Sequence, residues 1–472
     1  MLKTLSRIFP ILDHLYIYQV LEYNSWNFIK WFLKNPLKRN LQKKHKLEWT
    51  TKAKLLVLVG ITLLVLDSII TAFILGGGFL LFLLLLPIKS LYSPLFLIVA
   101  QLLISPLEVY QKEKILKVTA EKLKKLPDLK VVGITGSFGK TSTKDILYTL
   151  LWKKYYVVKT PKSFNTSLGI AQTILEDVKD NTQILIAEVG AYKRGEIAKI
   201  AKLLKPKIGI ITAVAPQHLE RFGSIENIAK AKFELVENLS QNGIAILNND
   251  SDLLQNLASH PQDVNVSYFG KESKYFASSI KVTKDGTTFM LHTPKATTQI
   301  TIPLIGEHHV QNFLAAAVAA LQLGLTLPEI KERAKLLLPT PHRLEIKKKG
   351  NLTIIDNTYN TNPKSSKSSL NLLAIFSGSQ KILITPGLVE LGSQSAKENQ
   401  VFAKEAAKIA NQIIIVGEYA RKNLLSGLSS AKFPKEKTFT AATLNQAMTL
   451  LGKISTPGAV VLLENDLPDQ YS

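Results

Sequence analysis

A run of glycine, lysine and hydroxyl side chains occupies residues 133–145, which read GITGSFGKTSTKD. It follows the short apolar run KVV and leads into ILYTLLWKK, a segment that can form a helix. Backbone amides between a strand and a helix N-terminus point at a bound anion, and the helix dipole favours negative charge there. We therefore expect this loop to bind phosphate, with Lys140 reaching the terminal phosphates and the Thr141 hydroxyl holding Mg²⁺.

The spacing of this loop departs from the strict pattern G-x-x-x-x-G-K-[ST]. Ile134 stands where the first glycine of that pattern falls, and Gly136 instead comes three residues before Gly139. An ordinary turn is the alternative, but the Gly-Lys-Thr triplet lies where a helix should start, which favours a phosphate loop. The residues expected to contact a nucleotide here are Thr135, Gly136, Ser137, Gly139, Lys140, Thr141 and Ser142.

The elements around the loop predict two α/β domains. From about residue 128, β-branched runs alternate with helical stretches, which is typical of a parallel sheet covered by helices. Sites in such sheets form at the carboxyl ends of strands, where Glu188 ends the run QILIAE. Residues 265–305 predict a small antiparallel patch, with a turn at Asp285-Gly286. After a break around Pro339–Arg343, the runs NLTIIDNTY, KILITPG, NQIIIVGE and AVVLLEN predict the strands of a second, Rossmann-like domain.

Composition narrows the class of protein and its partners. The chain has 472 residues, enough for two or three domains, and no cysteine, which excludes disulfides, thiolate metal sites and a cysteine nucleophile. Its net charge of +23 indicates an anionic partner. The sequence shows neither interleaved aromatic and basic residues nor a zinc finger, so we expect no nucleic-acid partner.

The N-terminal quarter reads as a membrane segment. Residues 30–54 are strongly basic, and an apolar region follows from Leu55 to Leu107 with charges at Asp67 and Lys89 alone. Because a crossing needs about 20 apolar residues, we place spans near 55–75 and 79–104. Pro87 inside the second span leaves a broken or re-entrant segment open. A buried soluble hairpin is disfavoured because soluble helices of this length show a polar face.

Basic residues flank the apolar region on both sides, which determines the expected orientation. The positive-inside rule places both flanks in the cytoplasm, in contact with anionic lipids. We thus expect a multi-pass protein of the cytoplasmic membrane, with its α/β domains in the cytoplasm. The aromatic, apolar residues 1–33 are expected to lie in the interface.

Seven ordered motifs show a family resemblance over residues 128–465. They are TGSFGKTST, SFNTSLG, the run from AEVGAYKRGE to AKFEL at 187–235, IGEHHVQNFLAAA, HRLE, IIDNTYNTNPKSS and PGLVELG. This set resembles the Mur ligase family, and its order and spacing resemble the MurF branch. The resemblance implies an ATP-dependent acid–amino-acid ligase of peptidoglycan synthesis that activates a carboxylate as an acyl phosphate. An amine then attacks; in this branch D-alanyl-D-alanine is joined to a UDP-linked muramyl tripeptide.

The resemblance also implies roles for particular side chains. Glu188 and His218 correspond to metal ligands, and two Mg²⁺ ions are implied. Lys232 corresponds to a lysine that reacts with CO₂ to give a carbamate, an anion that can help hold Mg²⁺; the neighbouring Lys230 is the alternative. Catalysis is accordingly expected from Lys140, Lys232, His218 and Glu188.

Further residues match the family's nucleotide and substrate positions. Asn312, at an expected helix start, corresponds to an adenine contact, Arg343 to a phosphate contact and Asp356 to a ribose contact. Because Arg343 and Asp356 come from the C-terminal domain, we expect domain closure to assemble the site. Weaker substrate positions are Asn165, Thr166, Asn360 and Asn362.

Three departures from the family pattern concern substrate recognition. The MurF branch begins with a soluble UDP-sugar domain, whereas residues 1–110 here are membrane segment and basic flank. Its K-G-S-R run after the last strand is replaced by Glu464, Asn465 and Asp466, and Asn357 replaces a second aspartate. The donor carboxylate is therefore expected at the membrane, with a partner protein as one possible supplier of precursor binding.

The predicted fold is a P-loop Mur-ligase domain and a Rossmann-like C-terminal domain preceded by an α-helical transmembrane hairpin. The expected parts are a basic cytoplasmic segment (1–54), the hairpin (55–107), the central ATP-binding domain (108–338) and the C-terminal domain (339–472). Two alternatives remain: a ligase of the poly-γ-glutamate synthase type, disfavoured by NTYNTNP and GLVELG, and a nucleotide-binding membrane scaffold without catalysis.

Overall fold

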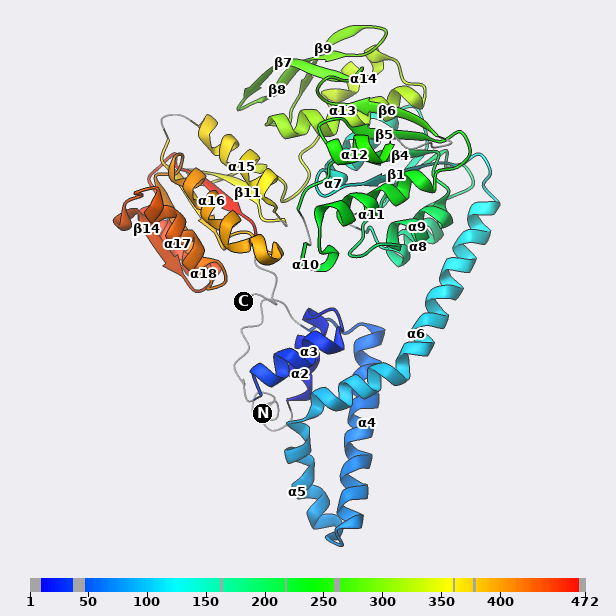
Figure 1. The fold of residues 1–472 in the computed structure, drawn as a ribbon, viewed down its shortest axis with the longest axis vertical. Helices are drawn as coiled ribbons and strands as arrows, with labels where there is room; N and C mark the ends of the chain where they lie inside the picture. Colours follow the sequence, from blue (N-terminus) through cyan, green and yellow to red (C-terminus); the bar gives the residue numbers. More distant parts are fainter. Residues whose placement is uncertain are drawn as a thin grey trace. The chain divides into compact units, whose positions relative to one another are not determined.

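The structure is a computed structural model that describes residues 10–36, 47–161, 164–216, 219–258, 264–359, 361–376 and 379–466. The chain divides into two compact units, one within residues 1–114 and one over residues 115–466 (Figure 1). Helix α6 (Ser93–Lys124) begins in the first unit and ends in the second.

The first unit is helical. Its elements are α2 (Ile11–Val20), α3 (Ser25–Lys34), α4 (Thr51–Ile74), α5 (Gly78–Ser90) and the first part of α6. By length and composition, α4 and α6 are apolar and long enough to cross a membrane. The first predicted span corresponds to α4. The second is broken at Leu91–Tyr92, between α5, which contains Pro87, and α6.

The middle part of the second unit contains a six-stranded parallel sheet in the order β2-β3-β1-β4-β5-β6. Side chains of α7 and α13 pack on one face, and those of α8, α9 and α11 on the other. The strands are β1 (Lys130–Thr135), β2 (Val157–Lys159), β3 (Ile184–Glu188), β4 (Ile208–Ile211), β5 (Ile244–Asn248) and β6 (Asn265–Phe269). The helices are α7 (Lys140–Leu151), α8 (Ser167–Glu176), α9 (Glu196–Leu204), α10 (Leu219–Phe222), α11 (Ile225–Glu237), α12 (Asp252–Ala258), α13 (Glu307–Gln322) and α14 (Leu327–Ala334).

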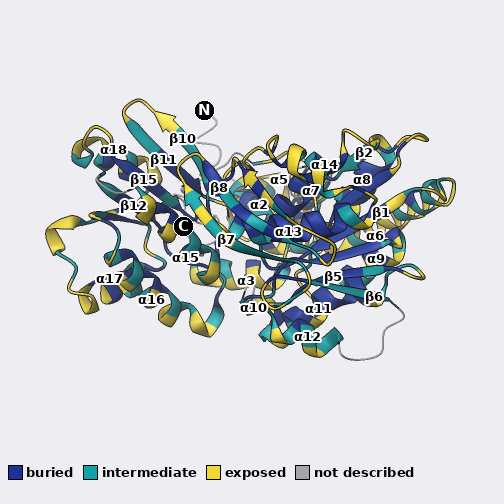
Figure 2. Ribbon diagram, turned by 90° about the horizontal axis from the view of Figure 1, so that it is seen from above, coloured by how far each residue is buried: buried dark blue, intermediate teal, exposed yellow. Residues whose placement is uncertain are grey.

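The predicted antiparallel patch is smaller than expected. Strands β7 (Phe276–Thr283), β8 (Gly286–His292) and β9 (Thr297–Ile302) form it. The turn between β7 and β8 is at Lys284-Asp285, one residue before the expected Asp285-Gly286. The run VSYFGKES was wrongly assigned to the patch, because β6 pairs in parallel with β5. Helix α13 lies between the patch and the main sheet, which is why it is almost entirely buried (Figure 2).

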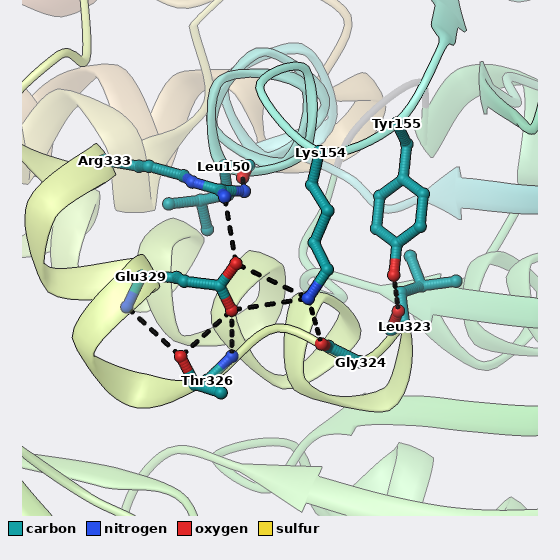
Figure 3. Close-up of polar contacts among 8 residues, drawn as sticks. All are labelled: Leu150, Lys154, Tyr155, Leu323, Gly324, Thr326, Glu329 and Arg333. Carbon is teal, nitrogen blue, oxygen red and sulfur yellow. Dashed lines mark hydrogen bonds and ion pairs between the residues drawn. The ribbon is translucent and has the colours of Figure 1, made fainter.

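The helix that starts at the phosphate loop is fixed at its far end by polar contacts (Figure 3). Arg333 donates a hydrogen bond of 2.6 Å to the carbonyl of Leu150, near the end of α7. Lys154 donates to the carbonyl of Gly324 at 2.9 Å and pairs with Glu329, whose carboxylate also completes the capping box of α14 with Thr326. These contacts hold α7 against α14, so the position of the loop is set by packing at both ends of the helix.

The C-terminal part of the second unit has a six-stranded sheet in the order β10-β11-β15-β12-β13-β14. The pairing of β10 with β11 is antiparallel and the other pairings are parallel. Strands β10 and β14 were missed in the sequence. The elements are β10 (Glu345–Lys349), β11 (Leu352–Asn357), α15 (Pro363–Ile375), β12 (Lys381–Thr385), α16 (Ser395–Ala407), β13 (Gln412–Val416), α17 (Arg421–Ser430), β14 (Thr438–Ala441), α18 (Leu444–Ile454) and β15 (Val460–Glu464).

Candidate active site

The loop between β1 and α7 requires glycine at two positions. Gly136 has φ +156° and Gly139, the N-cap of α7, has φ +81°. A Cβ on Gly136 would lie 2.0 Å from Thr212 Oγ1, and one on Gly139 would lie 2.2 Å from Asn312 Oδ1. Any side chain at these positions would therefore clash as well as strain the backbone.

The loop is anchored on the carboxyl end of β4. The Ser137 amide donates to the carbonyl of Ala213 at 2.8 Å, and the Ser137 hydroxyl donates to the carbonyl of Ala215 at 2.9 Å. Thr212 donates to the carbonyl of Phe138 at 2.5 Å. Because both the amide and the hydroxyl of Ser137 are hydrogen-bonded in this anchor, the structure supports a role for Ser137 in positioning the loop. Thr135 and Ser142, also expected here, are buried.

Lys140 folds back over the loop that precedes it. Its Nζ donates to the carbonyl of Gly136 at 2.5 Å. Burial lowers the pKa of Lys140 to about 8, against the attraction of Glu188, and the nearby Arg343 lowers it further. The ammonium therefore stands above the glycine turn, where phosphate oxygens would relieve its desolvation.

Glu188 ends β3 beside the start of α7. One carboxylate oxygen, Oε2, accepts from the Thr141 hydroxyl at 2.9 Å and from Lys144 Nζ at 3.1 Å, and the other accepts from Asn165 at 3.3 Å. Burial alone would raise the pKa of Glu188, but Lys144 and Lys140 hold it below its usual value. The carboxylate is therefore charged in this buried position.

Lys144 is a member of the site that the sequence analysis missed. Its side chain and that of Glu188 are each 1% exposed, so the two form a fully buried ion pair. Lys144 lies four residues after Lys140 on the same helix, a spacing that places both ammonium groups on one face of α7. That spacing is the signal that could have revealed it.

The Thr141 hydroxyl and the Glu188 carboxylate fit a Mg²⁺ site. Their oxygens lie 2.9 Å apart at the mouth of the loop, and hard oxygen ligands are those that Mg²⁺ prefers. Mg²⁺ usually keeps several waters and bridges to substrate phosphates, so two protein ligands are enough. Thr141 and Glu188 would hold the ion, which would neutralise phosphate charge, while the loop amides and Lys140 hold the phosphates themselves.

Lys232, on α11, is buried close to this cluster. Burial and the positive charge of Lys140 lower its pKa well below the usual value, and no hydrogen bond or ion pair reaches it within the described part of the chain. Lys230, the alternative, is exposed. Glu234 does not pair with Lys232, because its carboxylate accepts from the amides of Gly195 and Ala198 at the start of α9.

The segment just before β10 contributes a guanidinium to the loop. Arg343 donates to the Thr141 hydroxyl at 3.2 Å and stacks on the ring of Tyr359, with its guanidinium carbon 4.1 Å from the ring centroid. Thr340 donates to Asp145 on α7 at 3.3 Å. The expectation that the C-terminal part brings Arg343 to the phosphate loop therefore agrees with the geometry.

Asn312 and Asp356 occupy different surroundings. Asn312 lies against Gly139 as described above, but in the second turn of α13 instead of at the helix start that was expected. Asp356 belongs to a local hydrogen-bond network. Its carboxylate accepts from His342 at 2.8 Å, from Lys347 at 2.9 Å and from Thr358. Burial would raise the pKa of Asp356, and Lys347 and Thr358 lower it.

The group of possible metal ligands that includes Asp356 is already paired with a lysine side chain. His342, Glu345 and Asp356 each offer an atom within 4.8 Å of the others. Lys347 Nζ lies 2.9 Å from both carboxylates, so an ammonium already occupies the position between them and offsets one of their two negative charges. We therefore assign no ion here.

The weaker substrate positions are divided. Asn165 contacts Glu188, whereas Thr166 caps α8 by accepting from the amide of Gly169 at 3.3 Å. Asn362 caps α15 by accepting from two backbone amides at 3.0 and 3.1 Å. Thr166 and Asn362 thus have structural roles. His218 and Asn360 lie outside the described residues.

Glu464 and Asn465 form a second buried polar cluster, whose role the sequence did not indicate. Glu464 ends β15 and accepts from Asn357 at 3.0 Å, and burial raises the pKa of Glu464 to about 7. Asn465 accepts from the amide of Thr361 at 3.3 Å and donates to the carbonyl of Gly387 at 2.7 Å. The cluster holds Asn357, at the end of β11, and Thr361, just before α15.

Comparison with known proteins agrees with this geometry. The family description "Mur ligase middle domain" matches residues 134–320, and "Mur ligase, glutamate ligase domain" matches residues 342–464. The UDP-N-acetylmuramoyl-tripeptide–D-alanyl-D-alanine ligase of Escherichia coli K12 is 33% identical over 342 residues, covering 70% of this chain and 75% of that protein. The Bacillus subtilis ligase of the same name is 32% identical over 282 residues, covering 59% and 60%.

Solved structures agree as well. MurF from Acinetobacter baumannii superposes with a TM-score of 0.69 at 27% identity, covering 76% of this chain and 78% of that one. MurF ligase from Thermotoga maritima in complex with ADP superposes with a TM-score of 0.67 at 26% identity, covering 76% and 81%. The phosphate loop, the two α/β sheets and these likenesses define a Mur ligase. The chain belongs to the Mur ligase family, in its MurF branch, and is an ATP-dependent ligase.

Proposed function

We propose that this chain is a membrane-anchored MurF-type ligase that joins a cell-wall precursor carboxylate to an amino acid or dipeptide amine. The observation that carries the proposal is the convergence of Lys140, Thr141, Glu188 and Arg343 at one loop. Relatives in this branch are named for a UDP-muramoyl tripeptide and D-alanyl-D-alanine, which we take as the default substrates.

The reaction needs dense positive charge and little covalent help from the protein. The γ-phosphoryl group of ATP passes to the precursor carboxylate to give an acyl phosphate, the amine attacks its carbonyl carbon, and phosphate leaves. Lys140 and Arg343 would stabilise charge that develops on the transferring phosphoryl group. Since phosphate and carboxylate are both anions, this charge also lets them approach each other.

We further propose that Lys232 carries a carbamate and that His218 contributes to a second metal position. A neutral amine is the form that reacts with CO₂. The lowered pKa of Lys232 favours that form, and no residue in the described part of the chain pairs with its amine. With ¹³C-labelled CO₂, we expect a carbamate carbon signal that Lys232→Ala loses and the exposed control Lys230→Ala keeps. Rescue of Lys232→Ala by short carboxylic acids should accompany it. A signal that survives in Lys232→Ala would refute this assignment.

The proposed location is the cytoplasmic membrane, with the α/β unit in the cytoplasm. Two long apolar helices and the basic residues on both sides of them support this location. Anchoring would bring the ligase to precursors held at the membrane, whether by the chain's own contacts or by those of a partner protein.

Phosphate release by the detergent-purified protein tests the proposal. ATP and Mg²⁺ are supplied with D-alanyl-D-alanine and with either the UDP-linked tripeptide or its lipid-linked equivalent. We expect release to require both substrates and the product to gain the mass of one dipeptide. ATP binding without release on either donor would contradict the proposed substrates.

A further inference from the structure

The hairpin of α4 and α5 in the first unit carries exposed apolar side chains on both sides of its turn. Residues 72–86 contain no polar side chain, although they include the turn at Leu75–Gly77. Phe73 is 84% exposed and Phe79 is 74% exposed. A turn that faced water on the far side of a membrane would expose these rings and their leucine neighbours to solvent.

One ion pair marks a polar level on this hairpin. Lys89 on α5 donates to the Asp67 carboxylate and to the Thr71 hydroxyl on α4, both at 2.5 Å. Asp67 precedes the turn by eight residues, which is about 12 Å along the helix. If the hairpin crossed the bilayer completely, this pair would lie inside the hydrocarbon, where charged side chains are costly.

The second arm is too short for a return crossing. Helix α5 has 13 residues and is about 20 Å long, compared with about 30 Å for the hydrocarbon core. After Leu91–Tyr92 the chain continues in α6, which leaves the hairpin at an angle (Figure 1). The junction is fixed by a hydrogen bond of 2.7 Å between His14 on α2 and Ser93.

Three backbone amides of the turn are hydrogen-bonded within the hairpin. The amides of Leu75, Gly76 and Gly77 donate to carbonyls in the last turn of α4, at 3.0 to 3.1 Å. Gly76 has φ +67°, a conformation that lets the chain reverse without a side-chain penalty. Amides paired in this way can enter hydrocarbon, where unpaired ones would be costly.

We propose that the α4–α5 hairpin is a re-entrant anchor that enters one leaflet and returns to the same side, with the Asp67–Lys89 pair at headgroup level. The proposal rests on the membrane location proposed above and replaces two crossings with none. The exposed apolar side chains of the hairpin lie among the acyl chains of the cytoplasmic leaflet. The depth from the ion pair to the turn, about 12–17 Å, matches half of the hydrocarbon core.

The absence of cysteine from the chain makes a direct test possible. Leu75→Cys, Phe79→Cys and the exposed reference Lys112→Cys are each spin-labelled in the full chain, reconstituted into vesicles of phosphatidylethanolamine and phosphatidylglycerol. Collision rates with oxygen and with a water-soluble nickel complex report depth. We expect positions 75 and 79 to lie near the bilayer midplane and position 112 to be in water.

Two outcomes would overturn the proposal, and they differ in what else they overturn. Water-like collision at position 75, with labelling by an impermeant maleimide from the side opposite to position 112, would establish a crossing hairpin and leave membrane anchoring intact. Failure of the wild-type chain to float with the vesicles would overturn the anchoring as well. The phosphate-release assay is independent of both results.

Discussion

The two parallel sheets of the second unit each bury a polar cluster at the carboxyl end of a central strand, and the clusters differ in charge. At the first sheet, Glu188 is ionised and surrounded by Lys140, Lys144 and the Thr141 hydroxyl. At the second sheet, Glu464 is accompanied by neutral amides and its pKa is raised to about 7. Two carboxyl groups at the ends of inner strands thus serve different purposes. Cations surround the first, which suits phosphate binding, and the second is a structural group whose neutral form is favoured by burial.

The largest effect is expected from removing the cation at the first cluster. Lys140→Ala should lower phosphate release by at least about a hundredfold, because it deletes a charged donor aimed at the phosphates. The measurement is phosphate release at saturating ATP in the presence of both substrates. The control is Lys153→Ala, because Lys153 is exposed and lies beyond the end of α7. Undiminished release in Lys140→Ala would remove the distinction between the two clusters.

The buried ion pair gives the next effect. Lys144→Met leaves the carboxylate of Glu188 without its closest cation, so the free energy of unfolding should fall by about 3–5 kcal/mol. Lys153→Met should change it by less than about 0.5 kcal/mol. Denaturant unfolding of both variants measures this difference. Equal stability of the two would mean that Lys140 alone compensates Glu188.

The second cluster is expected to respond to pH in the opposite sense to a salt-bridged carboxylate. Because the pKa of Glu464 is raised from 4.5 to about 7, the native state keeps a proton that the unfolded state loses. Its stabilising contribution is complete below about pH 4.5 and is lost as pH rises through about 7. Glu464→Gln is neutral at every pH, so above pH 7 it should be more stable than wild type by up to about 3 kcal/mol.

Unfolding of wild type and Glu464→Gln across pH 5–8 measures this effect. The difference should shrink towards pH 5, where both side chains are neutral. A difference that is independent of pH would show that Glu464 is ionised in the native state, and the contrast with Glu188 would fail.

The smallest effect distinguishes a residue that caps a helix from its neighbour, which contacts the Glu188 carboxylate. Thr166→Ala removes the cap of α8 and should cost about 1 kcal/mol of stability without changing the rate of phosphate release. Asn165→Ala, which removes a contact to Glu188, should lower the rate instead. Thermal unfolding and the release assay together check the pair; a slower rate in Thr166→Ala would return that residue to the substrate positions.

Local patterns were sufficient for most of the fold and the centre of the site. Alternation of strands and helices predicted the parallel sheets, and the glycine loop predicted the Lys140–Thr141 position, because both signals are patterns of residues near in sequence. Two strands were missed for a reason: β10 carries KKK on an edge, and β14 has only four residues. Strand β6 was misplaced, since its pairing with β5 depends on a partner and not on its own residues.

What the sequence by itself determined was the phosphate loop, the apolar N-terminal region and the family, all carried by residue types at fixed spacing. Tertiary structure decided the rest. It showed that Lys144 pairs with Glu188 across 44 residues, that Lys232 and not Lys230 is buried, and that Glu464 braces Asn357 across 107 residues. Burial and pairing set the charge state of these groups, and neither can be read from a side chain's neighbours along the chain.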